Sequence, residues 1–325
     1  MLRLDRRSFM AAATAGAVLG LSKSVEIIPP ATAQSADASP LNPKALRFHK
    51  FKIGDIDATT VTDGSMSREH APGFVKNASV DEIKASLKAA AMPDDRLPNS
   101  YTVTIVRIGD RTIMFDSGNG AGRTPGIGLL QANMKAAGIE PASLTAIVVT
   151  HFHPDHIYGL YGPDDAPLYA NLEVVVPEAE YKYWADPAVI EALPESRRGI
   201  ARRVQASMPK WKSLRQVSAG SEALPGVRAV ATPGHTPGHT SYLVSAGSGS
   251  LMVLGDVTSI PPLNLRNPGW HIVFDQDARM AEATRRRVFD QAVADKIVCA
   301  GYHWGMPGAG TIAKDGNGYA LVPVA

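Results

Sequence analysis

The sequence has a single cysteine among 325 residues, and this excludes a fold that depends on internal disulfides. Cys299 lies within the apolar segment Lys296–Gly301, so we expect a buried structural thiol rather than a reactive one. No segment approaches the roughly 20 consecutive apolar residues that a membrane-spanning helix needs. Internal repeats of about 20–50 residues are also missing, which excludes a solenoid or a propeller built from such repeats.

The sequence also has almost no excess of charge. It contains 33 basic and 31 acidic residues, a net charge of +2. The first 33 residues contain four basic and two acidic side chains, so they account for the whole excess: Arg3, Arg6, Arg7 and Lys23 against Asp5 and Glu26. The rest of the chain is formally neutral and has no polybasic patch that would indicate binding to nucleic acid or an anionic membrane.

The N-terminus has the order of features that defines an export signal. The pair Arg6-Arg7 precedes an apolar stretch, Ala11–Leu21, and the small residues Ala31-Thr32-Ala33 follow as a cleavage site. We therefore expect residues 1–33 to be a twin-arginine signal and the mature protein to be periplasmic or secreted. Residues 34–48 are expected to form a loose segment, and residues 49–325 a single domain.

Apolar and β-branched segments alternate with helical patterns from residue 49 onward, which predicts an α/β fold. The expected strands are Phe51–Ile53, Ala58–Thr62, Thr102–Ile108, Thr112–Phe115, Ala146–Thr150, Leu172–Val176, Arg228–Ala231, Ser241–Val244, Leu251–Leu254 and Lys296–Ala300. The expected helices are Val80–Ala90, Gly126–Ala137, Glu178–Ala185, Glu195–Ser207 and Asp277–Ala294. We expect Asp275 and Asp277 to cap the last helix, and Arg285, Arg286 and Arg287 to form a solvated or salt-bridged face of it.

Histidines follow one of these strands in a dense pattern. His151, His153, Asp155 and His156 fall within six residues directly after the strand Ala146–Thr150. Residues two apart in an extended chain face the same way, and Pro154 suits the turn into a helix. Four ligand-type side chains at this spacing predict a metal site with room for two neighbouring ions.

Three later strands also end at a potential metal ligand. His235 follows Arg228–Ala231, Asp256 follows Leu251–Leu254, and His303 follows Lys296–Ala300. Strand ends of an α/β sheet meet in one crevice, so we expect these side chains to join the histidine-rich segment.

These motifs resemble those of the metallo-β-lactamase superfamily, over essentially all of residues 49–325. Asp116, the histidine-rich segment, His235, Asp256 and His303 occur in the order of the five family motifs. The resemblance implies a four-layered αβ/βα sandwich with helices outside two packed sheets. Within the superfamily, the chain is most similar to secreted enzymes of the methyl parathion hydrolase type, whose relatives include lactone-hydrolysing enzymes.

The resemblance also implies a role for each matching residue. His151, His153 and His235 would hold one divalent ion, Asp155, His156 and His303 a second, and Asp256 would bridge the two. Both ions are expected to be zinc. Asp116 would orient the histidine loop, and His239 would hydrogen-bond to backbone. A metal-bridging hydroxide would attack the substrate, with Asp256 and Asp155 as catalytic carboxylates.

The substrate is the least constrained part of the prediction. Tyr158 stands where the family commonly has glycine, so it is predicted to line the pocket. Trp184 resembles an aromatic wall residue of the parathion hydrolases, with a core position as the alternative. Arg123 and Ile200–Ala201 occur where those hydrolases are more aromatic, which favours an ester or lactone over an aryl phosphotriester.

Three other functions stay open at this stage. A β-lactam hydrolase shares the motifs, a mononuclear iron dioxygenase shares the superfamily, and a binding protein would keep the scaffold without catalysis. The intact ligand set argues against the last. The expected partner is a small-molecule substrate, and a homodimer is the assembly considered.

Overall fold

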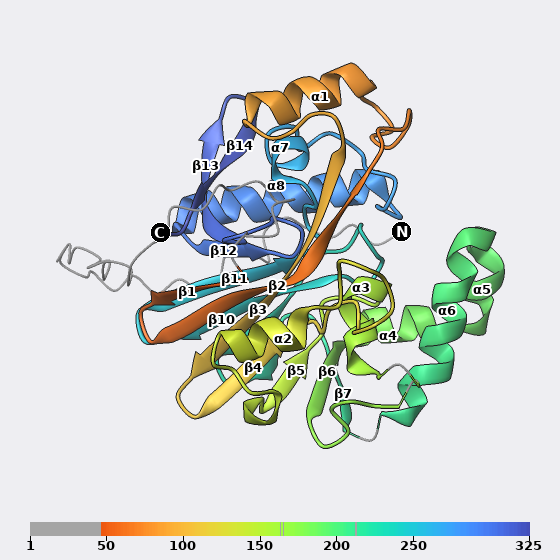
Figure 1. The fold of residues 1–325 in the computed structure, drawn as a ribbon, viewed down its shortest axis with the longest axis vertical. Coiled ribbons are helices and arrows are strands. Elements are labelled where there is room, and N and C mark those ends of the chain that lie inside the picture. The colour runs from red at the N-terminus through yellow and green to blue at the C-terminus, as the bar shows by residue number, and fades with distance from the viewer. Residues whose placement is uncertain (1–46, 163, 165, 212) are drawn as a thin grey trace, which may run out of the picture. The chain divides into compact units, whose positions relative to one another are not determined.

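Two seven-stranded β-sheets pack face to face, with helices on both outer faces (Figure 1). The structure is a computed structural model that describes residues 47–325 apart from 163, 165 and 212. The predicted signal, residues 1–33, and nearly all of the predicted loose segment 34–48 lie outside the described residues.

The first sheet is formed by the N-terminal half of the chain in sequence order. Its strands are β1 (Phe48–Ile53), β2 (Ile56–Arg68), β3 (Leu97–Ile108), β4 (Arg111–Phe115), β5 (Ala146–Val148), β6 (Glu173–Pro177) and β7 (Leu214–Val217). Strands β1 to β4 are antiparallel and β4 to β7 are parallel, so the sheet is mixed.

The second sheet is formed by the C-terminal half. Its order is β14 (Gly318–Pro323), β13 (Ala309–Asp315), β12 (Val298–Gly301), β11 (Gly249–Gly255), β10 (Thr240–Ala246), β9 (Val227–Ala231) and β8 (Glu222–Leu224). Only β11 and β12 are parallel neighbours in it.

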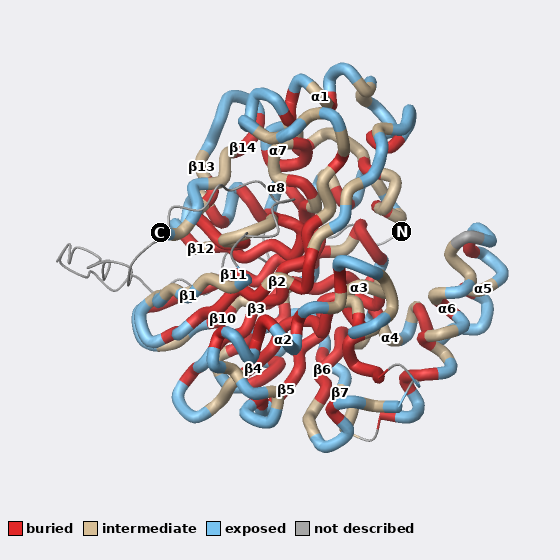
Figure 2. Tube along the Cα trace, viewed as in Figure 1, coloured by how far each residue is buried: buried red, intermediate tan, exposed pale blue. Residues whose placement is uncertain are grey.

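The side chains of the central strands enter two different cores, one on each face of the sheet. Successive side chains of a strand point to opposite faces, so neighbouring residues pack in different layers. In β5, Ala146 and Val148 enter the core between the sheets, while Ile147 and the following Val149 enter the core beneath the helices of the first sheet. The same alternation in β11 and β12 places Met252, Leu254 and Cys299 on the outer face of the second sheet. Figure 2 shows the sheets buried.

The helices complete four layers, as the resemblance implied. The first sheet is covered by α2 (Leu130–Ala136), α4 (Glu178–Ala185), α5 (Pro187–Ala192) and α6 (Glu195–Ser207), and the second by α8 (Ala278–Asp295). Helices α1 (Val80–Ala89) and α7 (Pro261–Asn264) share a smaller core, and α3 (Pro154–Ile157) is one short turn. Asp277 caps α8, where its side chain accepts a hydrogen bond from the Met280 amide at 3.0 Å, as expected.

Several edge and short elements differ from the sequence prediction. Strands β7, β8, β13 and β14 and the short helices α5 and α7 were not predicted, and β1 begins at Phe48, within the segment expected to be loose. Edge strands such as β14 pair on one side only and are partly exposed, so their sequences show no clear apolar alternation.

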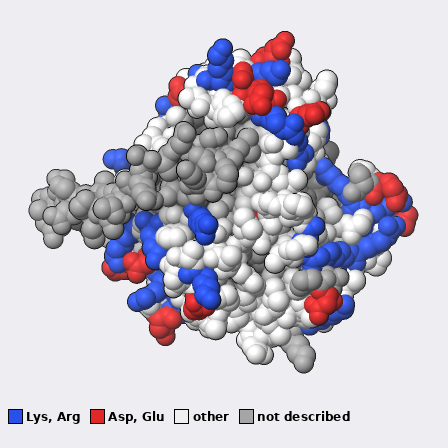
Figure 3. Space-filling model, viewed as in Figure 1, with Lys and Arg blue, Asp and Glu red and all other residues white. Residues whose placement is uncertain are grey.

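Cys299 is buried, as predicted, and burial raises the pKa of its thiol to about 12. Among the described residues, no helix combines the length and the apolar character needed to cross a membrane. On the face drawn in Figure 3, basic and acidic side chains lie mostly around the rim.

Candidate metal centre

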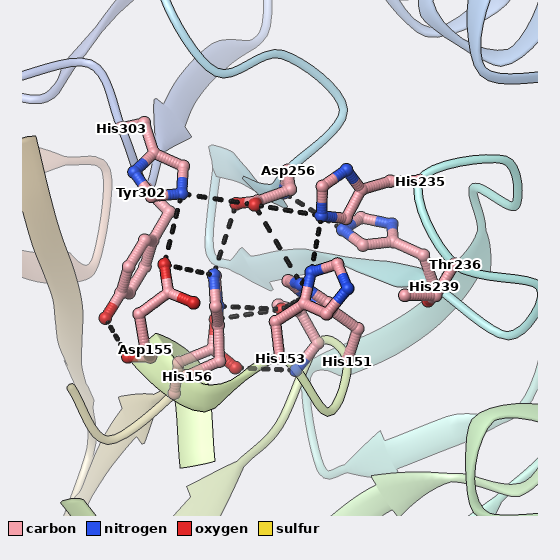
Figure 4. A network of polar contacts seen from close by, with 12 residues as sticks. His151, His153, Asp155, His156, His235, Thr236, His239, Asp256, Tyr302 and His303 are labelled. Carbon is pink, nitrogen blue, oxygen red and sulfur yellow. Dashed lines mark hydrogen bonds and ion pairs between the residues drawn. The ribbon is translucent and has the colours of Figure 1, made fainter. Parts of the chain in front are cut away.

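Seven ligand-type side chains point toward one another at the strand ends of the two sheets (Figure 4). His151 and His153 lie between β5 and α3, and Asp155 and His156 lie in the single turn of α3. His235 lies in the loop between β9 and β10, Asp256 directly follows β11, and His303 comes two residues after β12. The structure thus brings together all seven side chains that the sequence predicted to converge.

The first group of ligands consists of His151, His153, His235 and Asp256. Nδ1 of His153 lies 3.0 Å from Nε2 of His151 and 2.8 Å from Nε2 of His235. Oδ2 of Asp256 lies 3.2 Å from Nε2 of His235 and 3.9 Å from Nε2 of His151. Ligands about 2.0–2.1 Å from a tetrahedral zinc ion stand roughly 3.3 Å apart, so this group has the dimensions of such a site.

The second group consists of Asp155, His156 and His303. Oδ2 of Asp155 lies 3.6 Å from Nε2 of His156 and 3.4 Å from Nε2 of His303. Asp256 reaches this group too, because its Oδ1 lies 3.3 Å from Nε2 of His156 and its Oδ2 3.2 Å from Nε2 of His303. Asp256 thus stands between the two groups, the position implied for a bridging carboxylate.

Each histidine ring has one nitrogen that faces the other ligands and one that faces away. The hydrogen bond made by the nitrogen that faces away determines whether the inward nitrogen carries a lone pair. Nδ1 of His303 donates to the Ser100 carbonyl at 2.8 Å, so in the neutral ring the lone pair is on Nε2. The Thr150 hydroxyl donates to Asp116 at 2.8 Å, so it accepts from Nδ1 of His151 at 3.1 Å. Nε2 of His151 is therefore also a lone-pair atom directed inward.

The donor set fits a pair of divalent cations. Converging lone-pair nitrogens repel one another unless a cation lies between them, and a single shared proton cannot serve all three histidines of the first group. In the second group, Nε2 of His156 and Oδ1 of Asp256 are buried and have no hydrogen-bond partner among the described residues. Both atoms would be satisfied by coordination.

Buried electrostatics favour metal binding. Burial lowers the pKa values of His151 and His153 well below their usual range, so both are neutral, as ligands must be. Burial opposes protonation of His156 too, but the carboxylates of Asp256 and Asp116 raise its pKa well above the usual range. The same negative field that attracts a proton to His156 attracts a metal cation.

Asp116 orients the histidine loop, as the resemblance implied. Its carboxylate accepts hydrogen bonds from the Thr150 amide at 2.7 Å, the Thr150 hydroxyl at 2.8 Å and Nδ1 of His156 at 2.8 Å. The residue follows β4 with a φ of 62°, a left-handed conformation that is uncommon outside glycine and costs about 1–2 kcal/mol. The three hydrogen bonds compensate for this strain and fix the start of the loop.

His239 holds backbone rather than metal, also as expected. Its Nδ1 lies 3.1 Å from the Thr232 carbonyl, and its Nε2 accepts from the Asp256 amide at 3.0 Å. Burial lowers the pKa of His239 to about 3, so the ring is neutral and can accept. The ring therefore ties the backbone of Asp256 to the loop that carries His235.

Asp275 has a different role from the predicted helix cap. Its Oδ1 accepts a hydrogen bond from Nδ1 of His235 at 3.1 Å, while the cap itself is Asp277. Arg285 forms a salt bridge, one of the two possibilities expected for it, with Oδ2 of Asp275 at 3.1 Å, but it is 1% exposed and so does not lie on a solvated face. Sequence position alone gave no signal for either contact.

Glu180 is a buried carboxylate that the sequence analysis did not single out. It accepts hydrogen bonds from the Phe152 amide at 2.9 Å, the Thr236 hydroxyl at 2.7 Å and the Gly238 amide at 3.0 Å. Phe152 lies between two ligands of the first loop, and Thr236 directly follows His235. Glu180 thus cross-links the two loops that carry the histidines of the first group.

Trp184 occupies the alternative position considered for it, in the core. Its side chain is fully buried, and its indole N–H donates to Glu180 at 2.6 Å. A residue with no exposed surface cannot form a pocket wall, so the pocket assignment is wrong. The ring supports the site from behind, with its centroid 6.3 Å from that of His153.

One tyrosine packs against the second group, and another follows His156 by two residues in the chain. Tyr302 was not predicted; its ring centroid lies 3.8 Å from that of His156, and its hydroxyl donates to the Asp155 carbonyl at 2.5 Å. Tyr158 is partly buried. The guanidinium carbon of Arg203 lies over the tyrosine ring, 3.9 Å from the ring centroid. A pocket role for Tyr158 stays a prediction.

The two packed sheets and the two ligand groups at their strand ends are the features by which the chain can be placed in a family. The chain belongs to the metallo-β-lactamase superfamily, whose family model matches residues 96–301. This confirms the superfamily that the motifs indicated.

Proteins of similar sequence include N-acyl homoserine lactonases and a metallo-beta-lactamase domain-containing protein. An N-acyl homoserine lactonase from Bacillus sp is 26% identical over 152 residues, which are 47% of this chain and 53% of the relative. Metallo-beta-lactamase domain-containing protein 1 from Xenopus laevis is 31% identical over 157 residues, 48% of this chain and 53% of the relative. The chain thus spans about half the length of the curated relatives it matches.

Similar solved structures cover far more of the chain. AidC, described as a dizinc quorum-quenching lactonase in complex with a product, N-hexanoyl-L-homoserine, has a TM-score of 0.80 at 25% identity and covers 86% of this chain and 97% of its own. The hydrolase AbOPH of the beta lactamase superfamily also has a TM-score of 0.80 at 25% identity, with 87% and 99% coverage.

Proposed function

We propose that the protein hydrolyses the cyclic ester of an N-acyl homoserine lactone or a closely related small lactone. The observation that carries the proposal is the convergence of two ligand groups on Asp256, which stands between them. The relatives support the substrate class, because several are N-acyl homoserine lactonases and one similar structure is that of a lactonase with a ring-opened product.

We further propose that the two ions are zinc. The ligand set is five imidazoles and two carboxylates, without a thiolate, and imidazole with carboxylate suits zinc well. When bound, the pair would supply a nucleophile from water at neutral pH and polarise the carbonyl oxygen of the lactone.

The two carboxylates of the site have different surroundings. Asp256 is 4% exposed and lies between histidine nitrogens of both groups, whereas 21% of the Asp155 side chain is exposed. We assign Asp256 to holding the two groups at a fixed separation. Asp155 is in contact with solvent and is the carboxylate that can pass a proton between the opened ring and bulk water.

A substrate panel on zinc-reconstituted protein tests the proposal. The panel comprises N-hexanoyl homoserine lactone, an aryl ester, an aryl phosphotriester and a chromogenic cephalosporin. We expect kcat/KM for the lactone to exceed that for each of the others by at least about tenfold, which corresponds to about 1.4 kcal/mol of preferential transition-state binding.

The product and the metal content provide the controls for this panel. Chromatography should detect the ring-opened N-hexanoyl homoserine, which excludes cleavage of the amide. A higher kcat/KM for the cephalosporin or the phosphotriester would reject the lactone assignment. One iron per chain with oxygen consumption would instead identify a dioxygenase.

We also propose that the enzyme is exported through the twin-arginine route. The support is the order of Arg6-Arg7, the apolar stretch Ala11–Leu21 and the small residues before Gln34. Changing Arg6 and Arg7 together to lysine should retain the protein in the cytoplasm in a cell-fractionation experiment. Normal export of this variant would show that another route is used.

A further inference from the structure

Asp275 and Arg285 form a buried ion pair next to the first ligand group. Neither residue is one of the seven ligand-type side chains. Asp275 lies before α8 and is 4% exposed, and Arg285 lies within α8 and is 1% exposed. Oδ2 of Asp275 and Nη2 of Arg285 are 3.1 Å apart. Removing two charged side chains from water is costly, so a pair buried this completely requires a specific reason.

One end of the pair reaches a metal ligand. Oδ1 of Asp275 accepts from Nδ1 of His235 at 3.1 Å, so the carboxylate binds the ring on one oxygen and the guanidinium on the other. A carboxylate on Nδ1 fixes the neutral imidazole as the tautomer whose lone pair is on Nε2. That atom lies 2.8 Å from Nδ1 of His153, at the centre of the first group.

The other end of the pair reaches the backbone behind the bridging carboxylate. Nε of Arg285 donates to the Val257 carbonyl at 2.9 Å, and Val257 directly follows Asp256. Nη1 of Arg285 donates to the Pro268 carbonyl at 2.8 Å. Arginine offers donors in a planar fork, whereas lysine would place one compact charge and could not make these three contacts with the same geometry.

We propose that the Asp275–Arg285 pair is a positioning device for the first ion: it sets the tautomer of His235 and holds that ring in register with Asp256. The pair does not touch the ligands that belong to the second group alone, Asp155, His156 and His303, in any contact of the described residues. Among the contacts of the described residues, the ligand side chain that the pair touches is His235, which belongs to the first group alone.

Zinc titration of variants that can hold only one of the two ions tests this proposal independently of catalysis. The Asp155→Ala background retains the first ion, and the His153→Ala background retains the second. Competition with a chromophoric chelator gives a zinc dissociation constant in each. In the first background, we expect Asp275→Asn to weaken zinc binding by about 10- to 100-fold, the range for partners of metal-bound histidines. In the second, we expect a change below about threefold.

Arg285 is tested with a conservative pair of variants. Arg285→Met removes the charge and all donors, and should weaken the first ion by a similar factor. Arg285→Lys restores the charge alone and should rescue only part of the loss, because the Val257 contact depends on Nε. The double variant Asp275→Asn, Arg285→Met should weaken zinc binding by less than the product of the two single factors, because the two side chains support the same ring in part through each other.

Two further measurements separate positioning from general stabilisation. Nitrogen NMR of the zinc-loaded Asp155→Ala protein should show the Nδ1 proton of His235 in a hydrogen bond to Asp275, and Asp275→Asn should weaken that hydrogen bond. Arg286→Met on the same helix is the control, since Arg286 pairs with Glu282 at the surface. If Asp275→Asn lowers the melting temperature while both zinc dissociation constants stay unchanged, the pair is only structural and the proposal is overturned.

Discussion

Replacing Asp256 with asparagine should lower kcat/KM for the lactone by at least about 100-fold while the fold is retained. The carboxylate contacts histidine nitrogens of both groups, and the amide keeps the shape but loses the charge. Mutation of a residue that only hydrogen-bonds to a metal ligand lowers metal affinity or activity by about 10- to 100-fold. Mutation of a ligand shared by both groups should therefore lower kcat/KM by more. Circular dichroism and a steady-state assay on the zinc-loaded variant measure the two parts of this prediction.

The matched control is Asp295→Asn, which changes an exposed carboxylate at the end of α8 and should leave activity unaltered. Near-normal turnover by a fully metallated Asp256→Asn protein would contradict the bridging role. Loss of the native circular dichroism signal would instead show that the carboxylate is needed for folding.

Changing Asp155 to alanine should reduce the metal content from about two ions per chain to about one. Asp155 contributes only to the second group, whereas the first group keeps all four of its ligands. Activity should fall sharply, because the mechanism proposed above uses both ions and the Asp155 carboxylate. Elemental analysis after dialysis against chelator-treated buffer gives the stoichiometry.

The reciprocal change, His153→Ala, should also leave about one ion, at the other position. Cobalt substitution distinguishes the two, since the remaining ions have different ligands and should have different visible spectra. A reconstituted parent protein with only one ion, or an Asp155→Ala variant that retains two, would reject the two-ion arrangement.

The ligands themselves were predictable because their placement follows from local rules. Each directly follows a buried strand or lies one turn beyond it, and adjacent strand ends converge whatever the details of packing. His235, Asp256 and His303 were therefore assigned without any knowledge of tertiary contacts, and the structure brings all three together. Asp116 and His239 were recognised only through the family resemblance.

The residues behind the ligands could not be inferred in this way. Asp275 and Asp277 both precede a helix, and local rules cannot decide which is the cap; Asp277 makes the capping contact, and Asp275 bonds a ring 40 residues earlier. Glu180 is similar, since within α4 it has the sequence environment of a surface residue. Its burial depends on two loops that approach it from elsewhere in the chain.

The two sheets contribute to both ligand groups, and this makes each ion a cross-link between the halves of the chain. His151, His153, Asp155 and His156 follow a strand of the first sheet, whereas His235, Asp256 and His303 follow strands of the second. An ion that binds only the folded protein adds RT ln(1 + [L]/Kd) to the free energy of unfolding, about 2.7 kcal/mol at 100 times Kd. With zinc bound as proposed above, the free energy of unfolding would rise with the zinc activity of the surroundings, and a compartment poor in zinc would lower the stability of the protein as well as its activity.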